Sequence, residues 1–318
     1  MRPFRSLLGV LVTLLLLAPA CARSEGPAPA GTASSSAAGN AAVFPVTIVD
    51  DDGVSVTLNA PPERIVTFAP SATEILFALG RGERIVGVSG PYDDYPPAAK
   101  QIEQVGGAGE FGVEPNLEKV VSLQPDLLLT ISGGEQWKKH LRDLGVAVFT
   151  IDATDLEDLL SDIRTVGRLT GAVAAADALI TKMRAEDQDI QQRVAGEPPV
   201  TCFFEVYYPP LTTVGPDTFI ADLLRRAGCR SVSESAKGDY PQWSVDDLVR
   251  EGPQLYLVSS QSGASLGAVA KRPGFDAIRA VAEGHIVPID SDLVSRPGPR
   301  IVDGLRELAE ALHPNAFA

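Results

Sequence analysis

The chain has 318 residues, of which 41 are Asp or Glu and 27 are Lys or Arg. This excess of negative charge disfavours a nucleic-acid partner, because binding to phosphates needs positive charge. The hydrophobic content of 45% is that of a globular protein, and the length leaves room for two domains of ordinary size. No internal apolar run reaches the roughly 18 residues that a membrane-spanning helix needs.

The N-terminal segment has the pattern of an export signal. Arg2 and Arg5 give a basic start, Leu7–Leu17 is an almost wholly apolar run, and small residues precede Cys21. The apolar run is too short for a membrane anchor. A Cys directly after small residues resembles a bacterial lipoprotein signal, which implies that Cys21 is lipidated and becomes the new N-terminus. Ordinary secretion is the alternative, and lipidation is the interpretation we favour.

A flexible tether is predicted to follow this signal. Residues 21–43 are mostly Ala, Ser, Gly and Pro, and such a segment cannot bury enough apolar surface to fold. We therefore expect residues 1–20 to be a signal peptide and residues 21–43 to be a lipidated Cys with its tether. The remainder is expected to form a globular body held near the outside of a bacterial membrane.

The globular part opens with a predicted hairpin. The β-rich runs 46–49 and 54–58 flank the acidic turn Asp50–Gly53, a pattern typical of hairpins. Ser71 and Glu74 then form a capping-box pattern, which predicts that they open a helix over residues 72–79. Further strands are predicted at 64–68, 85–88, 127–131 and 146–151, and further helices after Asn116 and at 135–144. Strands that alternate with helices indicate a mostly parallel sheet covered on both faces.

The segment 172–194 predicts one long helix. Apolar residues recur along it at three- and four-residue steps, with one gap at Asp187, and no Pro or Gly interrupts it. These apolar residues are Val173, Ala176, Ile180, Met183, Ile190 and Val194. We interpret the segment as a stiff helix between two α/β halves. The alternative is an amphipathic crossover helix within a single sheet.

Beyond this helix the alternation resumes, and part of the first half is repeated. Strands are predicted at 200–206, 255–258 and 285–289, and helices at 219–226 and 300–312. Residues 116–130 align without a gap with residues 244–258, and each segment has an N-cap residue, a short helix, a Pro and an apolar strand. This repeat suggests two lobes of similar fold.

The predicted fold class is therefore α/β, with two similar lobes that carry mostly parallel sheets and are joined by one long rigid α-helix. We expect an N-terminal lobe over residues 44–171, the linking helix over 172–196 and a C-terminal lobe over 197–318. In open α/β sheets ligands sit outside the carboxyl ends of the strands, so two facing lobes would enclose a cleft.

Loops after the predicted strands carry the candidate cleft residues. Aromatic side chains gather there although only 6% of the chain is aromatic, and this suits a large, flat, partly apolar ligand. The alternative is that these rings hold their own loops in place. The candidates for ligand binding are Ser71, Tyr92, Phe111, Tyr207, Tyr208, Tyr240, Trp243 and Arg296. Arg296 is a candidate partner for a ligand carboxylate or phosphate, whereas Arg300 is expected to begin the last helix.

Enzyme and metal-site signatures are weak. Residues 107–112 match G-x-G-x-x-G, but no helix begins within them, as a dinucleotide site requires. The three histidines are scattered without a second ligand at metal spacing, so no metal site is expected. Cys202 and Cys229 form a disulfide or remain buried free thiols, two alternatives that the sequence leaves open. No catalytic residue and no cofactor is expected.

A family resemblance is carried by residues 62–80, 92–97, 116–119, 124–126 and 240–244. Together they look like the substrate-binding proteins of ABC importers for cobalamin and iron–siderophores. The resemblance implies a ligand held between two lobes and delivery to a permease dimer with a cytoplasmic ATPase.

Within that family, residues 92–97, 101–105 and 240–242 look most similar to the cobalamin-binding branch. Aromatic side chains line the corrinoid pocket in that branch, and Tyr92 and Tyr240 match such positions. The implied ligand is cobalamin or a related corrinoid, with an iron–siderophore or haem as the alternative. A hydrolase of the same two-lobed shape, using Asp or Glu in the cleft, is a further hypothesis.

Glu118 and Asp246 occupy the same position in the two repeats, just inside the start of a short predicted helix. An acid there interacts favourably with the helix N-terminus, worth about 0.3–1 kcal/mol. The resemblance implies a second role, because related importers use a matching pair of acids to engage Arg residues on two permease subunits. We expect an extracytoplasmic, lipid-anchored monomer whose protein partner is the permease.

Overall fold

The computed structural model describes residues 43–108, 114–262 and 265–318. The predicted signal peptide, Cys21, the tether up to residue 42 and Phe111 lie outside these ranges. None of the helices in the described ranges is long and apolar enough to cross a bilayer.

The N-terminal lobe is built on a parallel sheet of four strands, in the order β4-β3-β7-β8. Its strands are β3 (Ile65–Phe68), β4 (Ile85–Gly87), β7 (Leu127–Thr130) and β8 (Ala147–Thr150). The predicted hairpin is confirmed as the antiparallel pair β1 (Val46–Val49) and β2 (Ser55–Leu58). A second antiparallel pair is β5 (Gly106–Ala108) and β6 (Glu114–Pro115). The helices are α1 (Pro70–Ala78), α2 (Leu117–Ser122), α3 (Glu135–Asp143) and α4 (Leu156–Leu169).

The C-terminal lobe repeats this architecture. Its strands are β9 (Val200–Glu205), β10 (Cys229–Ser231), β11 (Leu255–Ser259) and β12 (Ile286–Ile289), all parallel, in the order β10-β9-β11-β12. In both sheets the first strand along the chain stands between the second and the third. The helices of this half are α6 (Phe219–Arg226), α7 (Val245–Glu251), α8 (Leu266–Val269), α9 (Arg279–Ala282), α10 (Ser291–Val294) and α11 (Ile301–Leu312). The predicted pair of similar lobes is confirmed.

The internal repeat is also preserved in backbone geometry. Asn116 and Ser244 are the N-cap residues of α2 and α7, and each side chain accepts a hydrogen bond from a backbone N–H three residues on. Gln124 and Gly252, which align in the repeat, both adopt left-handed backbone, with φ of 49° and 56°. The chain therefore has positive φ at the same aligned position after both helices, before it enters the third strand of each sheet.

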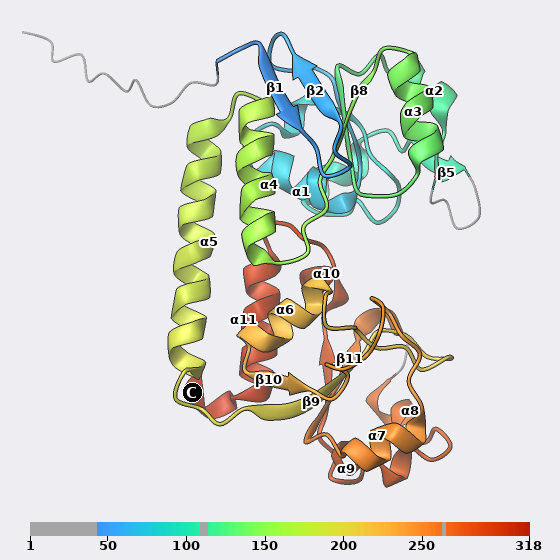
Figure 1. Ribbon diagram of the computed structural model, residues 1–318, viewed down its shortest axis with the longest axis vertical. Coiled ribbons are helices and arrows are strands. Elements are labelled where there is room, and N and C mark those ends of the chain that lie inside the picture. Colours follow the sequence, from blue (N-terminus) through green and yellow to red (C-terminus); the bar gives the residue numbers. More distant parts are fainter. Residues whose placement is uncertain (1–42, 109–113, 263–264) are drawn as a thin grey trace, which may run out of the picture. The chain divides into compact units, whose positions relative to one another are not determined.

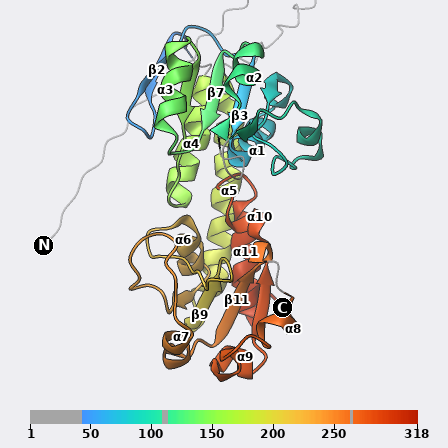
Figure 2. The ribbon, with the colours of Figure 1, turned by 90° about the vertical axis from the view of Figure 1, so that its right-hand side faces the viewer.

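The long helix is confirmed as α5 (Val173–Val194), which runs beside both lobes (Figures 1 and 2). It packs on α4 and on α11, and one continuous apolar cluster extends from α1 through these helices to α6. The alternative of a crossover helix within one sheet is wrong, because each lobe has its own sheet.

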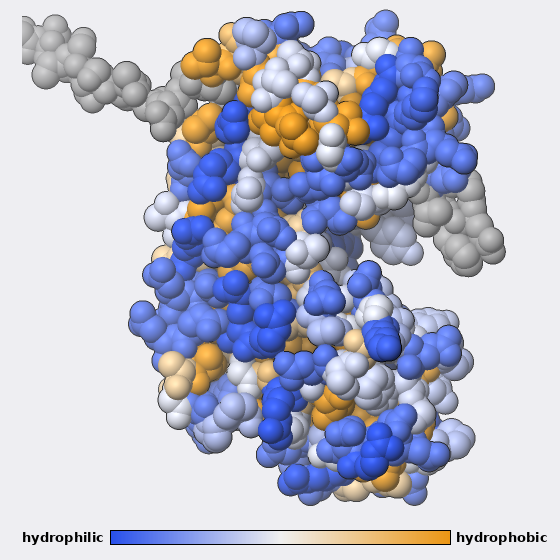
Figure 3. All heavy atoms as spheres, viewed as in Figure 1, coloured by the Kyte–Doolittle hydropathy of each residue, from blue (hydrophilic) through white to orange (hydrophobic). Residues whose placement is uncertain are grey.

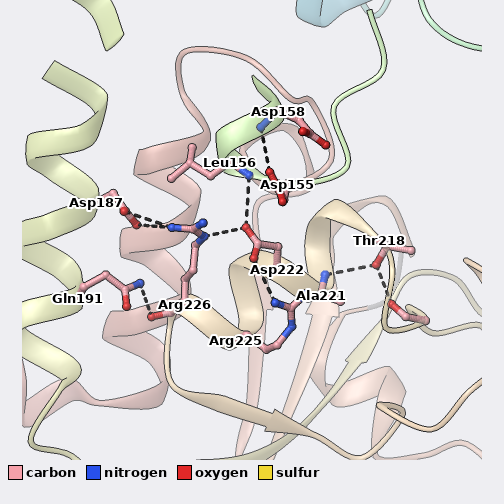
Figure 4. Close-up of polar contacts among 11 residues, drawn as sticks. Asp155, Leu156, Asp158, Asp187, Gln191, Thr218, Ala221, Asp222, Arg225 and Arg226 are labelled. Carbon is pink, nitrogen blue, oxygen red and sulfur yellow. Dashed lines mark hydrogen bonds and ion pairs between the residues drawn. The ribbon is translucent and has the colours of Figure 1, made fainter. Parts of the chain in front are cut away.

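The single polar gap in the stripe of α5 has a structural reason. Asp187 accepts a hydrogen bond from Arg226 of α6 at 3.2 Å (Figure 4). Arg226 also donates to Asp222 at 2.7 Å, and the Asp222 carboxylate accepts the backbone N–H of Leu156, the first residue of α4, at 3.3 Å. This network ties the C-terminal lobe to both long helices.

Two sequence interpretations are settled by the strand and helix positions. Cys202 and Cys229 form a disulfide between neighbouring strands β9 and β10, with their Cα atoms 5.9 Å apart. The predicted capping box is wrong, because α1 begins at Pro70, and its N-cap residue Ala69 has no side-chain cap. Proline at the first helical position has no N–H that needs a hydrogen-bond acceptor. The Glu74 carboxylate pairs with Arg300 instead of capping the helix.

Candidate ligand-binding cleft

The first of two adjoining pockets lies within the N-terminal lobe and has a volume of about 760 Å³. It is lined by residues that directly follow β3 and β7, including Ala69 and Ile131, and by Tyr92 and Trp137. These two strands flank the point where the strand order reverses. Ligands of open α/β sheets bind at such a point, outside the carboxyl ends of the strands.

The second pocket, of about 530 Å³, is lined by both lobes and shares Ile131 with the first. The N-terminal lobe contributes Ser71 and residues 151–154, and the C-terminal lobe contributes residues 217–220 and Tyr240. The space-filling view shows the surface hollowed between the lobes (Figure 3). The two pockets together form what we call the cleft.

Only some of the predicted ligand-binding residues line the cleft. Tyr92 and Tyr240, one from each lobe, are 67% and 58% exposed, and Ser71 is buried beneath the second pocket. Tyr207 is exposed but is not among the described residues that line either pocket.

Tyr208 and Trp243 are partly buried and pack against the core of the C-terminal lobe. The ring of Tyr208 stacks on the Arg272 guanidinium, with 4.0 Å from the guanidinium carbon to the ring centroid, and meets Phe275 edge-on at 5.5 Å. Trp243 packs against the same apolar cluster. For these two rings the geometry agrees with the alternative that loop aromatics hold their own loops.

Arg296 is engaged within the protein. Its guanidinium pairs with Asp94 at 2.9 Å and with Asp292 at 2.8 Å, and Glu74 lies 3.8 Å away. Only 11% of its side chain is exposed. The hydrogen bond from Arg296 holds the pKa of Asp94 below its usual value.

Trp137 was missed as a cleft residue. It lies in the first turn of α3, directly after the loop that leaves β7, and its ring meets Phe68 edge-on at 5.6 Å. The aromatic residues predicted to line the cleft all lie in loops, whereas Trp137 is a helical residue. Its place in the cleft could be inferred from the sequence, because it lies only a few residues after the end of a predicted strand.

The second pocket is strongly acidic. Asp152, Asp162, Asp217 and Asp239 line it, and no Lys, Arg or His is among its described lining residues. Burial, reinforced by Asp51, Asp158 and Asp152, raises the pKa of Asp162 to about 8. Among the described residues no group of three His, Cys, Asp or Glu side chains is placed to hold a metal ion.

Asp162→Asn should stabilise the protein at alkaline pH. Because the folded-state pKa of Asp162 lies above its ordinary value of 3.8, its contribution to stability is fully present below pH 4 and is lost as the pH rises through about 8. Asn does not ionise, so the unfolding free energy of the variant relative to wild type should rise between pH 5 and pH 8 by at least about 1.4 kcal/mol, the worth of one pKa unit.

Urea unfolding at the two pH values measures this effect. Asp177→Asn, which changes an exposed acid on α5, is the matched control. Equal stability differences at pH 5 and pH 8 for Asp162→Asn would contradict the assignment of a raised pKa.

A cleft between two α/β lobes, with exposed aromatic rings on both sides, defines a two-lobed solute-binding protein. The comparisons with known proteins identify the family. The model of the periplasmic binding protein family matches residues 65–293. The chain therefore belongs to this family of extracytoplasmic proteins.

The most informative relatives are two sequences and one solved structure. YvrC of Bacillus subtilis, named an uncharacterised ABC transporter substrate-binding lipoprotein, is 34% identical over 97% of this chain and 98% of its own length. A cobalamin-binding protein of Halobacterium salinarum is 32% identical over 98% of this chain and 84% of its own. The periplasmic vitamin B12-binding protein BtuF of Vibrio cholerae superposes with a TM-score of 0.71 and 25% identity, over 81% of this chain and 98% of BtuF.

All three relatives are named as binding proteins, and YvrC is named as that of an ABC transporter. The chain is accordingly a substrate-binding protein of an ABC importer and not an enzyme, and the hydrolase hypothesis is set aside.

Proposed function

We propose that this protein captures cobalamin or a related corrinoid between its two lobes and delivers it to an ABC permease dimer with a cytoplasmic ATPase. The observation that carries the proposal is the pair Tyr92 and Tyr240, exposed on opposite lobes and lining adjoining pockets of about 760 and 530 Å³. Two rings facing a cavity of this size suit a large, flat ligand with apolar faces. The names of the Halobacterium and Vibrio relatives support the corrinoid.

An iron–siderophore or haem is the second candidate ligand. Corrinoids, ferric siderophores and haem all absorb visible light, so the spectrum of protein purified from its own host distinguishes a loaded from an empty cleft. Native mass spectrometry of the same sample identifies the ligand by mass. A siderophore or haem mass, without a corrinoid, would contradict the corrinoid proposal.

We further propose that Cys21 is lipidated and that the protein is a monomer held on the outer side of the membrane by this anchor and its tether. The sequence around Cys21 supports this, and the similar YvrC is named a lipoprotein. Mass spectrometry of the intact mature protein tests it, because lipidation adds acyl chains to an N-terminal Cys.

Tyr240→Ala should weaken binding of cyanocobalamin by about 1 to 3 kcal/mol, as for other aromatic anchors at binding sites. The ring stands on the C-terminal side of the second pocket, so its loss removes stacking area without touching a core residue. Isothermal titration calorimetry measures the change.

Tyr207→Ala is the matched comparison for this variant. Tyr207 is a similarly exposed tyrosine of the same lobe, 51% against 58%, that lines neither pocket in the described part of the chain. We expect its replacement to change affinity by much less. An equal loss in both variants, or none in Tyr240→Ala with the fold intact, would place Tyr240 outside the ligand contacts.

A further inference from the structure

The charged groups of the cleft all have one sign. Glu114 lines the first pocket, and Asp152, Asp217 and Asp239 line the second, while the described lining residues include no Lys, Arg or His. Asp162 also lines the second pocket, but with a pKa of about 8 it is mostly protonated at neutral pH.

The acids of the second pocket are not neutralised by the protein. Among the described residues, Asp152, Asp217 and Asp239 have no ion-pair partner, and all three are exposed. One neighbouring cation is Arg296, between the pocket residues Ser295 and Pro297, and its charge is already paired with Asp94 and Asp292. Another is Lys237, which is two residues before Asp239 in sequence but does not line the pocket. The cleft therefore presents uncompensated negative charge to whatever enters it.

Such a cleft discriminates between ligands by charge. Haem carries two carboxylates and ferric catecholates are polyanions, so both would be repelled, and no cation in the described lining receives an anionic group. A corrin ring is surrounded by amide groups, whose N–H donors suit carboxylate acceptors. Complete cobalamin adds a phosphodiester with one negative charge, whereas a corrinoid without the nucleotide tail keeps the net positive charge of its cobalt centre.

We propose that the cleft selects cationic corrinoids that lack the phosphate-bearing nucleotide tail over complete cobalamin and over anionic chelates, with Asp152, Asp217 and Asp239 as the residues that determine this preference. This inference rests on the proposed corrinoid function. The inference adds that the physiological ligands include incomplete corrinoids. An enzyme that attaches a nucleotide tail must then use these corrinoids as its substrate.

The test is a set of titrations of the wild-type protein with aquocyanocobinamide, cyanocobalamin and haemin at low and high salt. Attraction between unit charges in contact is worth about 1 kcal/mol in water, so cobinamide should bind about fivefold or more tightly than cyanocobalamin at low salt. The preference should shrink at high salt, because exposed charges are screened. Haemin should bind more weakly than either corrinoid.

Asp217→Asn combined with Asp239→Asn should move the ratio of the two corrinoid affinities toward one. Neither carboxylate has a described hydrogen-bond or ion-pair partner, so the fold should tolerate the change. Asp177→Asn with Glu310→Gln removes the same charge outside the lining of the cleft and should leave the ratio at its wild-type value.

The outcomes separate the two proposals. Suppose that cyanocobalamin binds but that the ratio of cobinamide to cyanocobalamin affinity is one, or that this ratio does not respond to salt and to the Asp217 and Asp239 substitutions. Selection by charge is then wrong, and the corrinoid function stands. If neither corrinoid binds, or haemin binds more tightly than both, the proposed function fails together with the inference.

Discussion

A protein with Glu118→Gln and Asp246→Asn should bind its ligand and melt as the wild type does, yet support no uptake when reconstituted with its permease in vesicles. Both acids are exposed at equivalent positions of α2 and α7, one on each lobe. Neither has an ion-pair partner in the described part of the chain. The residues that directly follow the two acids are, in contrast, paired within the protein. Lys119 pairs with Glu103, and Asp247 pairs with Arg250 at 2.6 Å.

The surroundings of the two acids favour docking. One turn further along each helix stands an exposed valine, Val121 at 37% and Val249 at 38%. Each lobe thus offers an unpaired acid beside an apolar side chain, in the same arrangement. A partner with two equivalent subunits, each presenting a cation, would fit this repeated surface. An exposed acid at a helix start contributes only about 0.3–1 kcal/mol to stability, so the melting temperature should barely change.

Vesicle uptake, calorimetry and thermal melting together test the assignment. Exposed ion pairs are individually weak, so each single substitution should reduce uptake only in part. The control is Glu135→Gln with Asp276→Asn, two exposed acids on different lobes that also stand in the first turn of a helical segment. Normal transport by the Glu118 and Asp246 double variant, or a loss of ligand binding in it, would show that these acids do not dock the permease.

The elements of the fold could be predicted where the pattern of apolar residues that defines an element lies within a short stretch of sequence. The strands of the two parallel sheets, except β10, and the apolar stripe of α5 follow from patterns within a few residues of each other. In contrast, α4 was not predicted, and its pattern includes Gly167, which ordinarily weakens a helix. In the structure a Cβ at Gly167 would lie 2.5 Å from the Cβ of Ala176, so glycine is required for the close approach of α4 to α5.

The cleft was predictable only in part, because partners come from distant segments. Tyr92 and Tyr240 could be proposed from their loops. Arg296 looked free in sequence, but its partner Asp94 is 202 residues away. Likewise, the disulfide depends on β9 and β10 being neighbours in one sheet, which no local pattern reveals.

Glu74→Gln should destabilise the protein by about 3–5 kcal/mol, the usual cost of removing one partner of a buried ion pair. The Glu74 carboxylate, on α1 of the N-terminal lobe, is 3% exposed and accepts two hydrogen bonds from Arg300, the N-cap residue of α11, at 2.6 and 2.9 Å. Without it, Arg296 keeps Asp94 and Asp292. Arg300 keeps the ring of Tyr95, at 4.0 Å, and the charge of Asp292, which already pairs with Arg296. Urea unfolding measures the loss.

The same variant tests whether the lobes are held at a fixed separation. Bending α5 would break backbone hydrogen bonds and packed contacts, so wild-type protein should show little change in radius of gyration by X-ray scattering when ligand binds. Because Glu74 and Arg300 come from different lobes, their ion pair should reinforce α5, and Glu74→Gln should make the radius more sensitive to ligand. Asp303→Asn, an exposed acid on α11 without this pairing, is the control for both measurements. A large contraction of the wild-type protein on binding would show that α5 and the Glu74 contacts do not limit closure.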